Sequence, residues 1–352
     1  MELLSVTMND GVKPRSEIEG KDNSSEDKSN YKIVRKGDMV YNSMRMWQGA
    51  NGISPCDGIV SPAYTVLMPK QEINNGYFAT LFKSVTLINE FRKNSQGMTS
   101  DTWNLKYPQI ETIKVQIPSV SEQDKVSELF SVLDERIATQ AQLVESLKKY
   151  KRGLLSQLIA QKKAFDTSGE WKTVKLGHIF KERTERAKGN ETLLAVTISN
   201  GVQRRDEIDL KDNSSDDKSN YKCVYIGDIA YNTMRMWQGA SGVSPYNGIV
   251  SPAYTIVTPI RPDLHNMTFW AYYFKYSPLV QTFQKYSQGL TSDTWNLKFP
   301  QFSEIAVTMP PISEQDKIAE CLSVFDEHCK CEDEKLQALL LVRTSLLQQL
   351  FI

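Results

Sequence analysis

Residues 95–106 read Ser-Gln-Gly-Met-Thr-Ser-Asp-Thr-Trp-Asn-Leu-Lys, and residues 287–298 repeat this stretch with one change, Met98 to Leu290. The likeness extends upstream, because residues 11–69 align without a gap on residues 201–259 with about 40 of the 59 positions identical. A period of about 190 residues is far longer than the roughly 20–50 residues of a solenoid unit. The sequence therefore predicts a duplicated domain whose copies are related by approximate two-fold symmetry.

Both copies end in a long helical pattern. Residues 121–125 and 313–317 read Ser-Glu-Gln-Asp-Lys and are followed by apolar residues at steps of three and four, the spacing of an amphipathic helix. We expect Ser121 and Ser313 to cap these helices. Each stripe needs a partner, and we favour packing of the two helices on each other as a spacer. Packing of each helix on its own block is the alternative. The residues expected at the helix-pair interface are Val126, Leu133, Ile137, Val144, Leu147, Ile318, Phe325, Leu336, Leu339 and Leu346.

The block before each helix has mixed secondary structure. Residues 37–42 and 58–67 are rich in β-branched and aromatic residues between Gly, Pro and Asn, which predicts short strands. Residues 77–93 and 268–285 have helical spacing, and we expect one helix in each, kinked or broken at Pro278 in the second. The fold class is thus α+β with irregular β structure. The predicted domains are residues 1–118, a helix with linker at 119–166, residues 167–310, and a second helix at 311–352.

The two copies differ at their starts. Met1 aligns with Glu191, so the first copy lacks a counterpart of residues 171–190, which include an expected first strand. A sheet that misses an edge strand is less stable, and its free edge can pair with another chain. We expect the first block to show both properties.

Composition excludes several classes of protein. Of 352 residues, 42 are Lys or Arg and 42 are Asp or Glu, so no net positive charge indicates a nucleic-acid partner, although a local patch would suffice. No apolar run reaches the length of a membrane span, the start lacks the features of a secretory signal, and we expect a cytoplasmic protein. The five cysteines form no disulfide framework, and Cys329 and Cys331 beside His328 lack zinc-site spacing, so we expect no metal.

Motifs of common enzymes do not occur in the sequence. There is no phosphate-binding loop, dinucleotide fingerprint, metalloprotease His motif or nucleophile elbow. The three histidines do not match between the copies. A duplicated methyltransferase is disfavoured because the strings nearest to an Asn/Asp-Pro-Pro-Tyr/Phe motif are Ser-Pro-Ala-Tyr at residues 61–64 and 251–254. The chain is therefore expected to bind rather than catalyse.

Two repeated segments carry the side chains best suited to contact DNA. Residues 41–52 and 95–106 offer Arg and Gln, which can make bidentate contacts with guanine and adenine, and glycines that allow close backbone approach. Solvated surface is the alternative for Arg45, Gln48 and Lys106, and a core position is favoured for Met44, Trp47 and Trp103. The candidates are Asn42, Arg45, Gln48, Gln96, Thr99, Ser100 and Lys106 in the first copy and Asn232, Arg235, Gln238, Gln288, Thr291, Ser292 and Lys298 in the second.

The junction before each long helix resembles one family. Residues 117–126, Ile-Pro-Ser-Val-Ser-Glu-Gln-Asp-Lys-Val, and residues 309–318, Met-Pro-Pro-Ile-Ser-Glu-Gln-Asp-Lys-Ile, resemble the P-P-x-x-E-Q-x-x-I pattern of type I restriction–modification specificity subunits. Leu-Leu-Ser-Gln-Leu at residues 154–158 and Leu-Leu-Gln-Gln-Leu-Phe at 346–351 are similar to the family's helix ends, and residues 171–177 to its domain opening. The resemblance covers essentially the whole chain.

The resemblance implies two target-recognition domains separated by two long antiparallel coiled-coil helices, each domain reading half of a bipartite double-stranded DNA site. It implies a non-catalytic chain that works with modification subunits, expected to be two, and with restriction subunits. S-adenosylmethionine, ATP and Mg are expected on those partners and none on this chain. Because the two copies are nearly identical in their loops, we expect nearly identical half-sites arranged as an inverted repeat. The alternative is a remnant that binds the modification subunit without directing activity.

Overall fold

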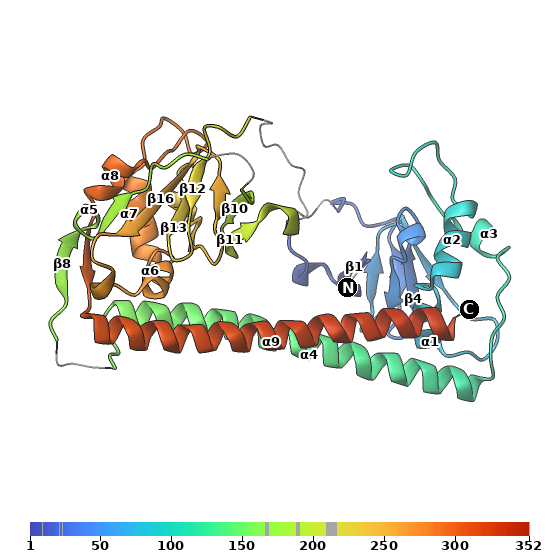
Figure 1. Cartoon of the computed structure of the whole chain (residues 1–352). Coiled ribbons are helices and arrows are strands. Elements are labelled where there is room, and N and C mark those ends of the chain that lie inside the picture. Colours follow the sequence, from blue (N-terminus) through green and yellow to red (C-terminus); the bar gives the residue numbers. More distant parts are fainter. Residues whose placement is uncertain are drawn as a thin grey trace. The chain divides into compact units, whose positions relative to one another are not determined.

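The computed structural model describes residues 1–8, 10–20, 22, 24–165, 169–187, 191–208 and 217–351 (Figure 1). The chain divides into two compact units, unit 1 being Met1–Leu143 with Glu332–Ile352 and unit 2 being Val144–Cys331. Each unit holds one copy of the repeat and about half of each long helix. Both units mix helices and strands, which confirms the predicted α+β composition.

Unit 1 contains two small sheets. The four-stranded sheet has the order β2-β1-β6-β3, with β1 parallel to β6 and the other pairs antiparallel, and the three-stranded antiparallel sheet has the order β5-β4-β7. Leu4, Val34 and Val60 are buried in the core of the first sheet. The strands are β1 (Glu2–Thr7), β2 (Gly11–Pro14), β3 (Lys32–Val34), β4 (Met39–Asn42), β5 (Asn51–Ile53), β6 (Gly58–Val60) and β7 (Tyr64–Leu67).

Unit 2 repeats the three-stranded sheet with one strand added, and its other strands form the two-stranded sheets β10-β11, β12-β15 and β17-β8. β14-β13-β16 correspond to β5-β4-β7, and β9 extends this sheet by pairing with β16. A further strand, β8, pairs with β17. The strands are β8 (Lys172–Lys175), β9 (Phe180–Glu182), β10 (Leu194–Thr197), β11 (Gly201–Arg204), β12 (Lys222–Val224), β13 (Ile229–Asn232), β14 (Ser241–Val243), β15 (Gly248–Val250), β16 (Tyr254–Pro259) and β17 (Ala306–Met309).

Each block has two helices: the break expected at Pro278 in the second block is confirmed, and the single helix expected in the first block was wrong. The pairs are α1 (Asn75–Leu81) with α2 (Val85–Asn94), and α6 (Met267–Tyr273) with α7 (Ser277–Tyr286). Pro278 lies in the first turn of α7, where a missing N–H is tolerated. The first copy breaks at the same place without a proline, because Ser84 caps α2 by accepting a hydrogen bond from the Leu87 N–H. Shorter helices complete the blocks: α3 (Tyr107–Ile110), α5 (Leu176–Ile179) and α8 (Phe299–Ser303).

The long helices are α4 (Val120–Ile159) and α9 (Ile312–Leu350). The prediction that Ser121 and Ser313 cap these helices was wrong by two residues, because both serines already lie inside the helices, which begin at Val120 and Ile312. The hydroxyl of Ser119 and the carbonyl of Pro311 accept instead the N–H of Glu122 and of Glu314.

The repeated Gln-Asp pair ties each long helix to its block. Gln123 is buried, and its Oε1 accepts the Asn74 N–H at 2.9 Å while Asp124 accepts from the Asn74 side chain at 2.7 Å. Asn74 in turn caps α1 by accepting from the Tyr77 N–H. Unit 2 has the same arrangement at Asn266, Gln315 and Asp316. The signature motif thus fixes the start of the helix.

Within each unit, the long helices pack on the block and also contact each other. In unit 1, Val126 and Leu346 pack on the core of the block, and in unit 2 Ile318 is part of that core. Contacts between α4 and α9 include the ion pair Arg343–Asp134 in unit 1 and Lys151–Asp326 in unit 2. The other residues expected at the interface are buried or half-buried: Leu133, Ile137, Val144, Leu147, Phe325, Leu336 and Leu339.

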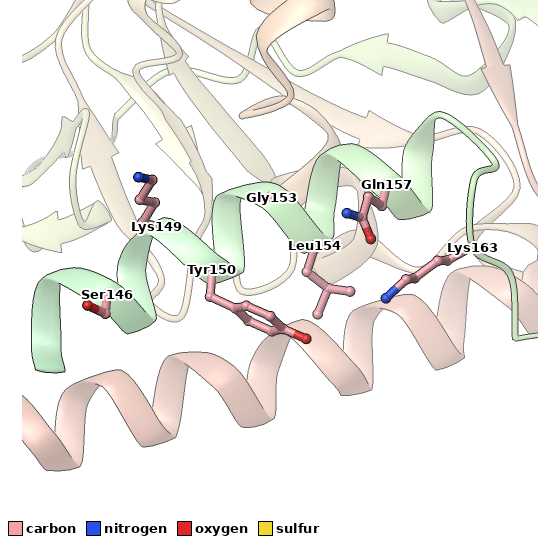
Figure 2. A pocket seen from close by; sticks show the side chains of 7 residues that line it. All are labelled: Ser146, Lys149, Tyr150, Gly153, Leu154, Gln157 and Lys163. Carbon is pink, nitrogen blue, oxygen red and sulfur yellow. The ribbon is translucent and has the colours of Figure 1, made fainter.

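A hollow of about 410 Å³ lies along α4 in unit 2. Figure 2 shows Tyr150 and Leu154 on the side of α4 that faces α9, with Lys149 pointing away. The Tyr150 ring lies 5.5 Å from that of Phe325, centroid to centroid. All the residues that line the hollow lie on α4 or, like Lys163, just after its end.

Candidate nucleic-acid interface

The two repeated segments singled out for DNA contact lie side by side in each unit. In unit 1, residues 43–49 follow β4 and include a short 3₁₀ turn, Met46–Gln48, while residues 95–106 form a hairpin closed by the Gln96–Asn104 bridge. The Leu105 N–H donates to the Ser43 carbonyl at 2.8 Å and joins the two segments. In unit 2 the Leu297 N–H donates to the Thr233 carbonyl at 2.9 Å. We call these paired segments the loop pair of each unit.

A tryptophan pair braces each loop pair. The rings of Trp47 and Trp103 meet edge to face with centroids 5.1 Å apart, and those of Trp237 and Trp295 at 5.2 Å. All four are half-buried rather than part of a closed core. The core position favoured for Met44 was wrong, since this residue is 41% exposed, and its backbone carbonyl accepts a hydrogen bond from the Trp47 indole N–H. The tryptophans therefore shape the surface on which the candidates stand.

Gly97 sets the shape of the hairpin. Its φ of +143° is one that side chains rarely adopt, and a Cβ there would lie 2.6 Å from the Thr102 carbonyl oxygen. Gly289 has a φ of +141° and the same close approach to Thr294. The turn is closed further by Thr102, whose hydroxyl donates to the Thr99 carbonyl at 2.9 Å. A tight hairpin results, and it projects its tip into solvent.

The predicted contact residues differ in how freely they can reach a ligand. Asn42 and Asn232 are half-buried, and their side-chain oxygens accept the N–H of Met44 and of Met234. These hydrogen bonds shape the loop through the side-chain oxygen, and the side-chain NH2 group of each asparagine is left to contact a ligand. Arg45 and Gln48 are half-buried, whereas Arg235 and Gln238 are exposed. The hairpin candidates are all exposed: Gln96, Thr99, Ser100, Lys106, Gln288, Thr291, Ser292 and Lys298.

The structure adds two residues that the sequence argument missed. Met98 and Leu290 stand at the hairpin tips and are fully exposed, at 99% and 101%. Apolar side chains in such positions can contact thymine methyl groups or wedge between bases. An apolar residue between Gly and Thr in both copies was the available signal.

A half-buried lysine lies next to the loop pair of unit 2. Lys275 donates to the carbonyls of Ile198 and Gly239, and Gly239 ends the 3₁₀ turn of the loop. Burial, and secondarily the charge of Lys151, lowers the pKa of Lys275 to about 8. Burial also lowers the pKa of Lys83, its counterpart in unit 1. Lys275 therefore supports the loop backbone of unit 2 through these hydrogen bonds.

The described part of the chain contains neither a metal-binding cluster nor a membrane-spanning helix. Over those residues, no group of three or more His, Cys, Asp or Glu side chains is placed to hold a metal ion. Within the same residues, no helix combines the length and apolarity needed to cross a membrane.

Known proteins match this arrangement. Residues 5–149 and 168–341 match the model of the type I restriction modification DNA specificity domain. The chain belongs to this family. Its members are non-catalytic DNA-recognition subunits.

Individual relatives are more distant. A 184-residue stretch is 28% identical to the type I restriction enzyme MjaVIII specificity subunit of Methanocaldococcus jannaschii and covers 49% of this chain and 41% of that protein. The chain thus spans less than half the length of this curated relative. In structure it is similar to the type I restriction–modification S subunit from M. genitalium, with a TM-score of 0.55, 16% identity, and coverage of 91% of this chain and 84% of that one. A chain from a study of complex assembly and conformational transition of the type I R-M system gives a TM-score of 0.54 at 16% identity, covering 92% and 83%.

Proposed function

We propose that this chain gives a type I restriction–modification complex its DNA sequence specificity, with one half-site read by each loop pair. The observation that carries the proposal is that both units present the same braced pair of loops, with polar side chains exposed at the hairpin. The loops differ at few positions, such as Met98 and Leu290. Nearly identical loops recognise nearly identical half-sites.

The helix contacts support an inverted arrangement of those half-sites. Each block packs on the start of the helix that follows it and on the end of the other helix, with Phe130 and Phe351 in unit 1 and Leu322 and Ile159 in unit 2. In unit 1 the Gln140 amide donates to Glu332 at 2.7 Å, and these two residues are counterparts in the repeat. A residue that meets its own counterpart is typical of two-fold exchange. We propose that α4 and α9 form an antiparallel coiled-coil spacer between two inverted half-sites.

Catalysis is assigned to partners in this proposal. Two modification subunits would bind S-adenosylmethionine and methylate adenine, and restriction subunits would use ATP and Mg for cleavage. The net charge of zero fits a chain whose partners supply part of the attraction to phosphate. This chain itself would hold no cofactor.

A second candidate is a remnant that binds the modification subunit but no longer directs activity. The observation that favours it is the sheet of unit 1, which ends at β7 where unit 2 continues to β9. A DNA pull-down with the full chain separates the candidates, because the remnant would not retain DNA.

The test is long-read mapping of methylated adenines in cells that make this chain with its cognate modification subunit. We expect a new bipartite motif whose half-sites are inverted copies of each other. Half-sites of unrelated sequence would overturn the symmetric target, since they would require different recognition by nearly identical loops. No new methylation from a soluble complex would favour the remnant.

A further inference from the structure

Unit 1 has a cavity of about 820 Å³ between its block and its parts of the long helices. The walls include β2, β5, α1, α4 and α9. Apolar and charged side chains meet there, among them Ile53, Ile137, Leu340, Lys83, Asp134 and Arg343. None of the candidate DNA-contact residues lines the cavity. Its volume is in the range of small-molecule sites.

In unit 2 the corresponding place holds an aromatic side chain. The Tyr272 hydroxyl donates to the Asp326 carboxylate at 2.6 Å, and the Lys151 ammonium lies 4.7 Å from the centre of the tyrosine ring. A cation over the face of an aromatic ring attracts it. The counterparts of these three residues in unit 1, which all line the cavity, are Thr80, Asp134 and Arg343.

Thr80 leaves this place open. Its hydroxyl donates to the Gly76 carbonyl at 3.0 Å, within α1, and does not take the role of the tyrosine hydroxyl. Asp134 keeps its ion pair with Arg343, and the paired carboxylate in unit 2 shows that such a group can accept a further hydroxyl. The helices α1 and α6 occur in both copies, so the opening follows from the residue type at this one position.

Lys83 adds a cation with unused hydrogen-bond donors. In unit 2 its counterpart, Lys275, donates to the Gly239 carbonyl at 2.5 Å. In unit 1 the Asn51 side chain donates to the corresponding carbonyl, that of Gly49, at 3.1 Å. Among the described residues, Lys83 makes no hydrogen bond or ion pair, and it lines the cavity. A half-buried ammonium in this state gains most from an anionic acceptor.

We propose that the cavity of unit 1 binds a small aromatic ligand that carries a hydroxyl and an anionic group. The ring takes the place that the Tyr272 ring has in unit 2, and the hydroxyl donates to Asp134. The anionic group pairs with Lys83. The ligand thus has a charged partner at each end and apolar walls between them.

The probe is para-hydroxybenzoate, titrated into the full chain and followed by isothermal titration calorimetry. We expect saturable binding of one molecule per chain. Phenol lacks the carboxylate and benzoate lacks the hydroxyl, so each should bind at least about tenfold more weakly, the loss of one hydrogen bond to a charged group. Absence of saturable binding by para-hydroxybenzoate, or equal binding of all three compounds, would overturn the proposal.

Two variants of the full chain locate the binding. Thr80→Tyr places the ring of unit 2 in the cavity and should abolish binding. Lys83→Met should weaken binding of para-hydroxybenzoate at least about tenfold and leave binding of phenol unchanged, which also shows that the variant is folded. Lys93→Met, at a lysine of the same unit whose side chain is 70% exposed, is the matched control and should change neither. Unchanged binding of para-hydroxybenzoate by either variant would place the ligand elsewhere and overturn the proposal.

Discussion

Units 1 and 2 present the same loop pair on sheets that end differently. The Trp47–Trp103 and Trp237–Trp295 distances, 5.1 and 5.2 Å, agree although β16 is paired with β9 and β7 has no such neighbour in the described residues. The shape of the loops is therefore set locally, by the tryptophan brace and the bond between the segments. The missing edge should affect how strongly each unit resists unfolding rather than what its loops look like.

The largest effect is expected when unit 2 is made to resemble unit 1. Phe180→Ala removes a fully buried ring that packs on Trp270, Phe274 and Phe302, which costs about 3–5 kcal/mol. Hydrogen exchange in β16, followed by mass spectrometry, should speed up accordingly. Phe165→Ala, at an exposed position of the same unit, is the matched control. A decrease of less than about 1 kcal/mol in the free energy of unfolding would mean that the edge segment contributes little to the stability of unit 2.

The reverse change should make unit 1 resemble unit 2. A second copy of residues 170–190 placed ahead of Met1 continues the alignment of Met1 with Glu191. Burial of its Leu, Ile and Phe side chains, reduced by the entropy of ordering the segment, should stabilise unit 1 by about 2–3 kcal/mol. The melting temperature should rise by several degrees, and residues 64–69 should exchange more slowly.

The control for this fusion carries Leu176→Ser, Ile179→Ser and Phe180→Ser in the added copy only. It has the same length and should leave both measurements near those of the unfused chain. If the apolar fusion and this control have the same melting temperature and exchange rates, the added segment does not stabilise unit 1.

The sequence predicted what repeats and periodicity encode. The duplication, the long helices and the two loop segments were found because each depends on residues close together in the chain. The break between α1 and α2 was missed because a cap at Ser84 outweighs a continuous apolar pattern. The meeting of the loops depends on a bond from Leu105 to Ser43, and no local pattern encodes such a long-range contact.

A smaller effect should test whether the two loop pairs are equivalent. Arg45→Ala and Arg235→Ala should each weaken binding of the full chain to the target sequence identified by methylation mapping. The expected loss of binding free energy is about 1–3 kcal/mol, the range of a lost bidentate base contact. The ratio of the affinities for target and non-target DNA should fall, whereas the dependence of binding on salt concentration should change little. Arg261→Ala, at an exposed ion pair with Asp263, is the control. A uniform loss on all DNA sequences would assign these arginines to phosphate instead.

The smallest effect is expected at two ion pairs that occupy corresponding positions in the two copies of the repeat. Asp134 pairs with Arg343, and Asp326 pairs with Lys151. Asp326 also accepts from the Tyr272 hydroxyl at 2.6 Å, whereas Thr80, the counterpart of Tyr272, donates to the Gly76 carbonyl. Both aspartates are half exposed, so Asp134→Asn should lower the free energy of unfolding by about 0.5 kcal/mol. Asp326→Asn should lower it by about 1 kcal/mol, because this change also weakens the hydrogen bond from Tyr272 to a charged group. Urea unfolding of both variants in the Tyr272→Phe background should remove the difference, and equal losses with Tyr272 intact would show that the extra bond adds no stability to unit 2.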